Sequence, residues 1–212
     1  MDKIESFWNK QAKGYDKSED RFDPAFKIIL EKTKKYLKPD DVVLDFGCAT
    51  GSKTLEIAEN VKEIYGMDIS KKMIEEAENK KQKMGITNAW FFKGTLYDNG
   101  YDKGSFDVII SYGVLHLLKD LEDQLEQIRG LLKPGGLFIS TTACLKDKMA
   151  FRNRVEFLMY MFIKKIRLFP LFLHMFTVED VKNMVSDNGF EIIESESLFE
   201  GITMGFVVGK KW

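Results

Sequence analysis

The feature that most constrains the fold of this chain is an alternation of short strand-like runs and longer amphipathic runs between Asp41 and Thr142. The short runs are rich in β-branched and aromatic residues, which favour strands, and the longer ones carry apolar residues at helical spacing. Such alternation is typical of βαβ units, whose strands form a parallel sheet. The pattern therefore predicts an α/β fold with helices on both faces of a mostly parallel sheet.

Seven strands are predicted, at 41–46, 61–68, 88–94, 106–112, 137–143, 190–199 and 201–210. The last two are close enough to form a hairpin. Helices are expected at 51–60, 70–85, 120–132 and 178–189, and a turn at 133–136. Ser70 is the expected N-cap of the second helix, and Thr177 with Asp180 resembles a capping box before the last one. The loop 95–105 is rich in Asp, Asn and Gly, so any helix there should be short or missing.

The length of the chain favours a single domain. Its 212 residues, 44% of them hydrophobic, are enough for one sizeable core. Residues 1–40 contain two helical pieces, at 2–13 and 24–37, and we expect them to form a helical cover. Residues 145–176, which are basic and rich in Met and Phe, are predicted to be a helical insertion after the fifth strand.

Charge and cysteine content exclude several classes of protein. The formal net charge is −1, so no global field would recruit nucleic acid. Cys48 and Cys144 follow no metal spacing, and no metal site is expected. The polar start of the chain does not resemble a signal peptide, and a reducing cytoplasm fits best. The apolar run 157–176 is interrupted by charged residues and a proline, so it is too short to span a membrane.

A carboxylate and a glycine turn end the first predicted strand, in "DVVLDFGCATG". Ligands of open parallel sheets lie beyond the carboxyl ends of the strands, and Gly47 and Gly51 permit a tight turn and close packing there. A dinucleotide is a poor fit, because Asp45 would repel a pyrophosphate and two of the three fingerprint glycine places hold Ala49 and Ser52. S-adenosylmethionine carries an ammonium and a sulfonium but no phosphate, and so suits this acid.

A second acid, Asp68, closes the second predicted strand in "YGMDIS". It lies close to the position where an acid hydrogen-bonds ribose hydroxyls in nucleotide-binding sheets. Alternatively, Asp68 simply caps the helix that begins at Ser70. Each of these signals is weak alone, but their order along the chain indicates a nucleoside site.

Taken together, these segments resemble the class I S-adenosylmethionine-dependent methyltransferases. "VVLDFGCATG" is similar to their first motif, "GMDIS" to the second, "FDVIISYGVLHLL" to the fourth-strand motif and "LLKPGGLFIS" to the fifth. The resemblance implies a Rossmann-like sheet with S-adenosylmethionine as cofactor. "FWNKQAKGYDK" also resembles the entrance segment of the small-molecule branch that includes quinone-biosynthesis methyltransferases, in which a tyrosine followed by aspartate covers the cofactor.

The resemblance also assigns the cofactor site. It implies contacts from Tyr15, Asp45, Gly47, Cys48, Ala49, Gly51, Asp68, Ile69, Met73, Thr95, Leu96, Ser111 and Tyr112. Asp68 would bind the ribose, and Ile69 and Met73 would flank the adenine. The third motif usually reads Gly-Asp, but here Thr95 takes the place of the acid, and Asp98 is a possible substitute. The other reading is structural, with Cys48 and Met73 as core residues.

The catalytic residue is harder to predict. Transfer of a methyl group from a sulfonium needs a well-placed acceptor, and a base only if the acceptor must lose a proton. His116, after the fourth strand, is the first candidate base, although a structural role is equally compatible. Tyr15 and Tyr112 could orient an acceptor or merely cover the cofactor. His174 is expected to be a packing residue.

The insertion 145–176 is expected to lie over the cofactor and to form an apolar pocket, which favours a small lipophilic or aromatic acceptor. Its basic residues could instead draw an anionic head group or a membrane surface; these are Lys146, Lys148, Arg152, Arg154, Lys164, Lys165 and Arg167. A merely solvated basic face is the alternative.

The sequence thus predicts a small-molecule methyltransferase that does not act on nucleic acid, and it leaves the oligomeric state open. A non-catalytic protein that binds the nucleoside cofactor or a lipid surface, and a nicotinamide-dependent oxidoreductase, remain the alternatives.

Overall fold

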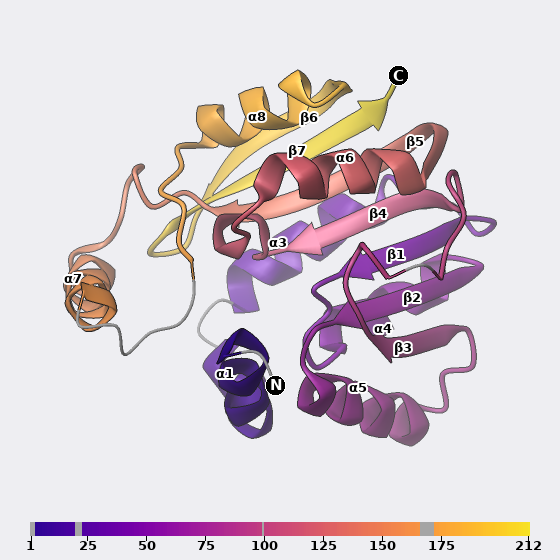
Figure 1. Ribbon diagram of the computed structural model, residues 1–212, viewed down its shortest axis with the longest axis horizontal. Helices are drawn as coiled ribbons and strands as arrows, with labels where there is room; N and C mark the ends of the chain where they lie inside the picture. The colour runs from indigo at the N-terminus through magenta and orange to yellow at the C-terminus, as the bar shows by residue number, and fades with distance from the viewer. Residues whose placement is uncertain (1–2, 20–22, 99, 166–171) are drawn as a thin grey trace.

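The computed structural model describes residues 3–19, 23–98, 100–165 and 172–212. Its strands form one seven-stranded sheet in the order β3-β2-β1-β4-β5-β7-β6, in which β7 runs antiparallel to both of its neighbours (Figure 1). The strands are β1 Val42–Phe46, β2 Glu63–Asp68, β3 Ala89–Lys93, β4 Phe106–Tyr112, β5 Leu132–Ala143, β6 Phe190–Phe199 and β7 Thr203–Lys211. The predicted α/β fold with a terminal hairpin is confirmed.

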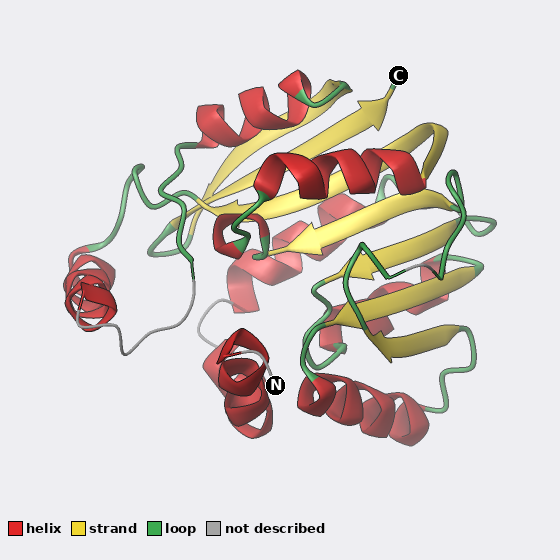
Figure 2. Cartoon of the chain, in the orientation of Figure 1, coloured by secondary structure: helices red, strands yellow, loops and turns green. Residues whose placement is uncertain are grey.

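Helices cover both faces of the sheet (Figure 2). One face is covered by α3 (Asp23–Lys34), α4 (Ser52–Ile57) and α5 (Lys71–Met84), and the other by α6 (Leu121–Leu131) and α8 (Val178–Asp187). The predicted caps are present: Ser70 Oγ accepts a hydrogen bond from Met73 N, and Thr177 and Asp180 form a reciprocal capping box. These caps satisfy backbone donors that an uncapped helix would leave unpaired.

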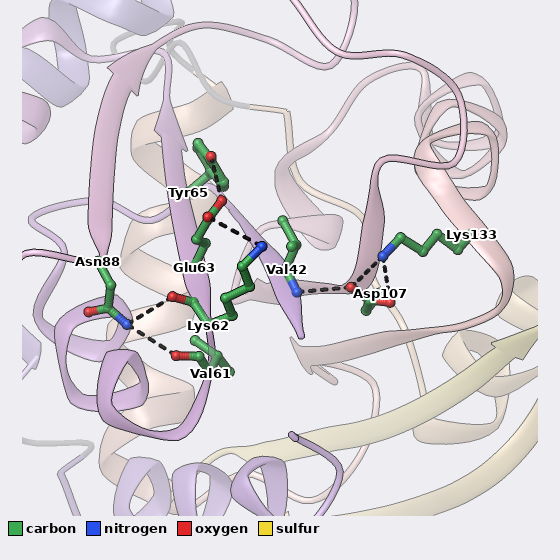
Figure 3. A network of polar contacts seen from close by, with 8 residues as sticks. All are labelled: Val42, Val61, Lys62, Glu63, Tyr65, Asn88, Asp107 and Lys133. Carbon is green, nitrogen blue, oxygen red and sulfur yellow. Dashed lines mark hydrogen bonds and ion pairs between the residues drawn. The ribbon is translucent and has the colours of Figure 1, made fainter. Parts of the chain in front are cut away.

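Polar side chains hold the amino ends of the strands in register (Figure 3). The carboxylate of Asp107 on β4 accepts hydrogen bonds from Val42 N on β1, at 2.9 Å, and from Lys133 Nζ on β5, at 2.7 and 2.8 Å. Asn88 Nδ2 donates to the carbonyls of Val61 and Lys62, just before β2. These contacts fix the amino edge of the sheet, whereas ligands of open parallel sheets bind beyond the carboxyl ends of the strands, where the site is therefore sought.

Several predicted boundaries shift. The helix expected at 51–60 divides into α4 and the 3₁₀ turn η3 (Ala58–Asn60). β5 begins at Leu132, which pairs with Phe106 before the register shifts to Leu137 opposite Val108, so the predicted turn 133–136 is a bulge within the strand.

In the two predicted helical regions, residues 1–40 and 145–176, the observed helices differ more from the predicted ones. In the N-terminal region, α1 (Lys3–Gln11) is followed by the 3₁₀ turn η1 (Ala12–Gly14) and by α2 (Tyr15–Glu19), and no pattern in the sequence predicted α2. In the insertion, the described helix is confined to α7 (Phe151–Lys165), and residues 172–177 have no regular structure. Within the described ranges, no helix combines the length and the apolar character that crossing a bilayer requires.

Candidate functional site

Two adjoining cavities lie at the carboxyl ends of β1 and β4, where the order of the strands reverses. Their volumes are about 160 and 210 Å³. Tyr15, Gly47, Ala49 and Tyr112 line both of them. This is the crevice in which open α/β sheets bind their ligands. One extended ligand could therefore occupy both cavities.

The turn after β1 forms the wall between the two cavities. Gly47 N and Cys48 N both donate to Met67 O on β2, at 2.8 and 3.0 Å. Gly47 has a φ of +78°, and a Cβ there would overlap the side chain of Val114. The turn can therefore place bare backbone against a ligand only because position 47 is a glycine.

Asp45 is a buried acid in the first cavity. Its side chain is 2% exposed, and its Oδ2 accepts a hydrogen bond from Thr54 Oγ1 at 2.5 Å. Burial raises its pKa to about 6, and the nearby charge of Asp68 adds to the effect. A cation in the cavity would offset both of these costs.

Asp68 lines the second cavity from the end of β2. Burial raises its pKa to about 6, although the carboxylate accepts hydrogen bonds from Ser70 N at 2.8 Å and Ala49 N at 3.1 Å. It therefore contacts Ser70, which is itself the N-cap of α5, and also fixes the turn after β1. Each carboxylate oxygen can accept more than one hydrogen bond, so these contacts are compatible with ribose binding.

Cys48 and Gly51, which follow Asp45 in the chain, are explained mainly by packing. Cys48 borders the first cavity, but burial raises the pKa of its thiol well above the usual range, so the thiol stays protonated and is a poor nucleophile. Gly51 has a φ of +73°, and a Cβ there would lie 2.7 Å from Phe91 and 2.8 Å from Ala77. Gly51 thus lets the start of α4 pack against α5 and β3.

The second cavity extends toward the end of β3. Ile69, Met73 and Gly94 line it. Thr95 is tied into its own turn, because its N and Oγ1 both hydrogen-bond to Asp98 Oδ2, at 2.5 and 3.1 Å. Leu96 is 5% exposed and belongs to the core. The described lining of the two cavities does not include Thr95, Leu96 or Asp98.

The end of β4 contributes Tyr112 rather than Ser111. Tyr112 lines both cavities and donates a hydrogen bond to Thr33 Oγ1 at 2.6 Å. Burial raises the pKa of its phenol strongly, so Tyr112 keeps its proton. Ser111 is fully buried and lies outside the described lining of the cavities.

His116 is not among the described residues that line the two cavities. It is part of the 3₁₀ turn η4 (Leu115–Leu117), and the described cavity lining includes its neighbour Leu117. Burial lowers its pKa to about 4, and the charge of His174 adds to this, so the imidazole is neutral at pH 7.

His174 connects the insertion to this turn. Its backbone N donates to His116 O at 2.7 Å, its Nε2 lies 2.8 Å from Leu118 O, and its ring stacks on Phe176. Since Leu118 lines the second cavity, residues after α7 support the cavity wall. The packing role expected for His174 agrees with these contacts.

The N-terminal helices cover the site and are joined to it by polar contacts. Asp16 accepts hydrogen bonds from Thr50 Oγ1 at 2.5 Å and Ser52 Oγ at 3.2 Å, and its Oδ2 lies 2.5 Å from Lys80 Nζ. Burial would raise the pKa of Asp16, but the hydrogen bonds from Lys80 and Thr50 outweigh it and keep the pKa below its usual value. Tyr15 is thereby held against both cavities.

Several lining residues were not identified from the sequence. They are Ile4, Trp8, Phe26, Lys27, Leu30, Phe46, Thr50, Ser52, Lys53, Glu56, Gly94, Gly113, Val114, Leu117, Leu118 and Lys119. Trp8 lies in the "FWNKQAKGYDK" segment, which had pointed only to Tyr15 and the aspartate after it. The others come from α1, α3 and α4 and from the end of β1 and the segments after β1, β3 and β4, and no local pattern reveals how these parts pack around the cavities.

Comparison with known sequences gives consistent matches. A family model described as "Methyltransferase domain" matches residues 37–198. An uncharacterized methyltransferase of Geobacillus kaustophilus is 28% identical over 152 residues, which are 68% of this chain and 69% of that protein. The demethylmenaquinone methyltransferase of Lactococcus lactis is 32% identical over 137 residues, 59% of this chain and 54% of that enzyme. The match thus spans only about half of the Lactococcus enzyme.

Solved structures share the fold. The YcgJ protein of Bacillus subtilis superposes with a TM-score of 0.69 at 18% identity, over 87% of this chain and 98% of that one. A chain from the complex of the Haloferax volcanii Trm112 activator with a putative methyltransferase reaches 0.76 at 19% identity, with 96% of both chains covered. The phosphoethanolamine N-methyltransferase 2 of Haemonchus contortus, solved with S-adenosyl-L-methionine, reaches 0.69 at 16%, over 87% and 52%.

Proposed function

Because this chain belongs to the methyltransferase domain family, we propose that it transfers the methyl group of S-adenosylmethionine to a small lipophilic or aromatic acceptor. The resemblance to S-adenosylmethionine-dependent methyltransferases is confirmed by the family match and the fold, and S-adenosylmethionine is the cofactor of that family. The acceptor and the roles of individual residues are our proposals.

The observation that carries the proposal is the pair of buried acids in the two cavities. Asp45 and Asp68 both have a pKa raised to about 6, so each carboxylate is poorly stabilised by the protein alone. A ligand with two positive charges and no phosphate would stabilise them, whereas a pyrophosphate would be repelled. We propose that Asp45 faces the methionine part and that Asp68 accepts from the ribose.

The remaining lining residues suit the rest of that ligand. Ile69 and Met73 offer apolar walls for a flat base, and the turn at Gly47 offers backbone beside the methionine part. Bound S-adenosylmethionine supplies an electrophilic methyl group on a sulfonium. The chain would then exclude water with Tyr15 and Trp8 and hold an acceptor in line with the methyl. Methyl transfer would form the bond to the acceptor as the carbon–sulfur bond breaks, with the electron pair of that bond left on sulfur.

Calorimetric titration with S-adenosylmethionine at several pH values tests the cofactor assignment. Each acid has a raised pKa, so each is protonated below pH 6, and a cationic ligand favours its ionised form. Affinity should therefore rise between pH 5 and 7 and level off above 7, by about tenfold for each acid that must lose its proton. Near pH 6 the measured heat should depend on the ionisation enthalpy of the buffer, because binding releases protons.

The nicotinamide-dependent alternative serves as the control for this experiment. A nicotinamide dinucleotide should give no heat under the same conditions. An affinity for S-adenosylmethionine that does not change between pH 5 and 7 would count against the role of the two acids. Heat from the dinucleotide alone would revive the oxidoreductase.

A lipophilic acceptor is supported by the lining of the second cavity. It is mostly apolar, and beyond the residues assigned to the cofactor it includes Trp8, Val114, Leu117 and Leu118. The demethylmenaquinone methyltransferase of Lactococcus lactis is, by its name, an enzyme for a quinone-type acceptor, and its similarity supports the same class here. We propose a panel of phenols, hydroquinones, amines and thiols, assayed with S-adenosylmethionine labelled on its methyl group.

His116 separates two mechanisms. Its neutral imidazole is outside the described cavity lining, which includes its neighbour Leu117, so we propose that it positions the cavity wall, with general-base catalysis as the second possibility. In either case, replacing His116 with Ala should lower turnover by roughly tenfold or more and change the affinity for S-adenosylmethionine less than twofold. The His174→Ala variant, which loses the contact with Leu118 O but keeps His116, is the matched comparison.

The two roles differ in their pH dependence. If His116 only positions the wall, the pH profile of kcat keeps its shape in the His116→Ala variant, and His174→Ala shows a similar loss. If His116 is the base, the acid limb of the profile disappears in His116→Ala alone. Unchanged turnover in both variants would contradict both roles.

A further inference from the structure

Helix α7 carries an apolar stripe that is exposed to solvent. Phe151, Val155, Leu158 and Met159 recur at intervals of three and four residues, so they lie on one side of the helix. Their exposed fractions are 83, 50, 61 and 61%. Figure 1 shows α7 set apart from the sheet, on the side toward which β4 points. Contiguous apolar surface of this kind usually marks an interaction site.

The orientation of the stripe is set by contacts on the opposite side of α7. Asn153 and Phe157 there are half-buried, and Asn153 lies against Gly201 in the turn between β6 and β7. Just before the helix, Ala150 N donates to Gly201 O at 2.8 Å, and Met149 forms a β-bridge with Ile202. The helix start is thus anchored to the hairpin, and the stripe faces outward.

Positive charge accompanies the stripe. At 100° per residue, Arg152 and Arg154 fall on either side of it, and both are exposed. Arg152 Nε lies 3.6 Å from Glu156 Oε1. Residues 145–176 contain seven basic and two acidic residues, a net charge of +5 in a chain whose net charge is −1. Of these basic residues, Arg167 and the side chains of Lys164 and Lys165 lie outside what the structure describes.

We propose that α7 lies flat on a bilayer containing anionic lipids, with its apolar stripe in the acyl boundary and Arg152 and Arg154 at the head groups. An apolar face flanked by basic residues is the arrangement of interfacial helices, whose binding combines apolar burial with attraction to anionic lipid. The proposal rests on the proposed function in one respect only: the bilayer would then be the source of a lipophilic acceptor, delivered beside the cavity wall that His174 supports.

The charge distribution favours a bilayer over a second copy of this chain. In a symmetric dimer through the stripe, the two strongly basic segments would face each other, and like charges in contact are unfavourable. An anionic surface has the opposite sign. It would also attract Lys146 and Lys148, which are exposed and precede the helix, although Lys146 Nζ also lies 3.2 Å from Asp180 Oδ2.

Flotation of the full chain with lipid vesicles tests the proposal. We expect binding to phosphatidylcholine vesicles that contain about a third phosphatidylserine, weakened in high salt, and little binding to phosphatidylcholine alone. The triple variant Val155→Ser, Leu158→Ser and Met159→Ser should reduce binding by roughly tenfold or more, because it removes most of the apolar contact. The double variant Arg152→Gln and Arg154→Gln should reduce it by roughly tenfold.

Matched controls use exposed residues away from α7. Ile28→Ser with Met84→Ser removes exposed apolar side chains, and Lys71→Gln with Lys83→Gln removes two exposed charges from α5. Both controls should float like the unmodified chain. Equal flotation of the α7 variants, or no flotation of the unmodified chain, would overturn the proposal. A third result would also overturn it: the unmodified chain does not bind vesicles but forms a concentration-dependent dimer, and the triple variant abolishes that dimer.

Titration of the same samples with S-adenosylmethionine keeps the two proposals separate. Cofactor binding without flotation overturns the bilayer contact alone. Flotation without cofactor binding overturns the proposed function and leaves the bilayer contact supported.

Discussion

Replacing Asp68 with Asn should weaken the binding of S-adenosylmethionine by roughly a hundredfold, since hydrogen bonds to a charged acceptor contribute about 1.5–3 kcal/mol each. Asn has nearly the same shape but only one acceptor oxygen, and that oxygen must also serve Ser70 N or Ala49 N. The substitution removes the negative charge at the ribose and part of the support for the turn. Calorimetry at pH 7.5, where the carboxylate is ionised, measures the effect.

The stability of this variant should change little. A pKa of about 6 means that the folded protein disfavours ionised Asp68, and removing that charge offsets the lost backbone hydrogen bond. Glu63→Gln, at the amino end of the same strand, is the matched control, and it should leave the affinity within twofold. Equal affinities in Asp68→Asn and the unmodified chain, both shown to be folded, would remove the ribose contact.

Replacing Gly51 with Val should destabilise the protein by about 3–5 kcal/mol. The left-handed backbone at Gly51 is unfavourable for any side chain and worst for a branched one. In addition, the new Cβ would lie within 2.8 Å of both Phe91 and Ala77. Urea unfolding followed by circular dichroism measures the free energy of unfolding.

Gly85 provides a control for the contribution of the backbone alone. It has a similar φ, +67°, but a Cβ there would meet nothing within 4 Å. We therefore expect Gly85→Ala to cost about 1 kcal/mol and Gly51→Ala clearly more, with the difference reporting the contact with Phe91. Adding Phe91→Leu to Gly51→Ala should recover part of that difference. Equal losses at both glycines would show that the close packing at Gly51 is relaxed at no cost.

Much of the fold could be predicted because its signals are local. The strands on either side of the glycine turn, the cap at Ser70 and the capping box at Thr177 depend on residues close together in the chain. The strand order could not be read in the same way, and here the resemblance to a known family supplied the Rossmann-like sheet. The turn after β1 and Asp68 line the cavities, and both could be picked out in the sequence because backbone geometry and charge restrict which residues such a turn accepts; their contacts with a cofactor stay a prediction.

The rest of the candidate site depends on packing between distant segments. Resemblance to the family motifs predicts Thr95 and Ser111 at the cofactor, but Thr95 is bonded to Asp98 and Ser111 is buried in the sheet. His116 follows β4 as expected, yet the short turn η4 places Leu117, and not the imidazole, at the cavity. In a 3₁₀ turn, a shift of one residue changes which side chain faces a ligand. Such a short turn has no periodic pattern in the sequence from which the facing residue could be predicted.

The contacts of Asp16 would affect the rate at which a bound cofactor exchanges with solvent. One carboxylate joins the N-terminal cover to Thr50, Ser52 and Lys80, so lifting the cover breaks these contacts together rather than one at a time. Tyr15, which precedes Asp16 and lines both cavities, would move away from a bound ligand when the cover opens. If this cooperative opening is slower than methyl transfer, then release of the demethylated cofactor, and not the chemical step, sets the rate of turnover.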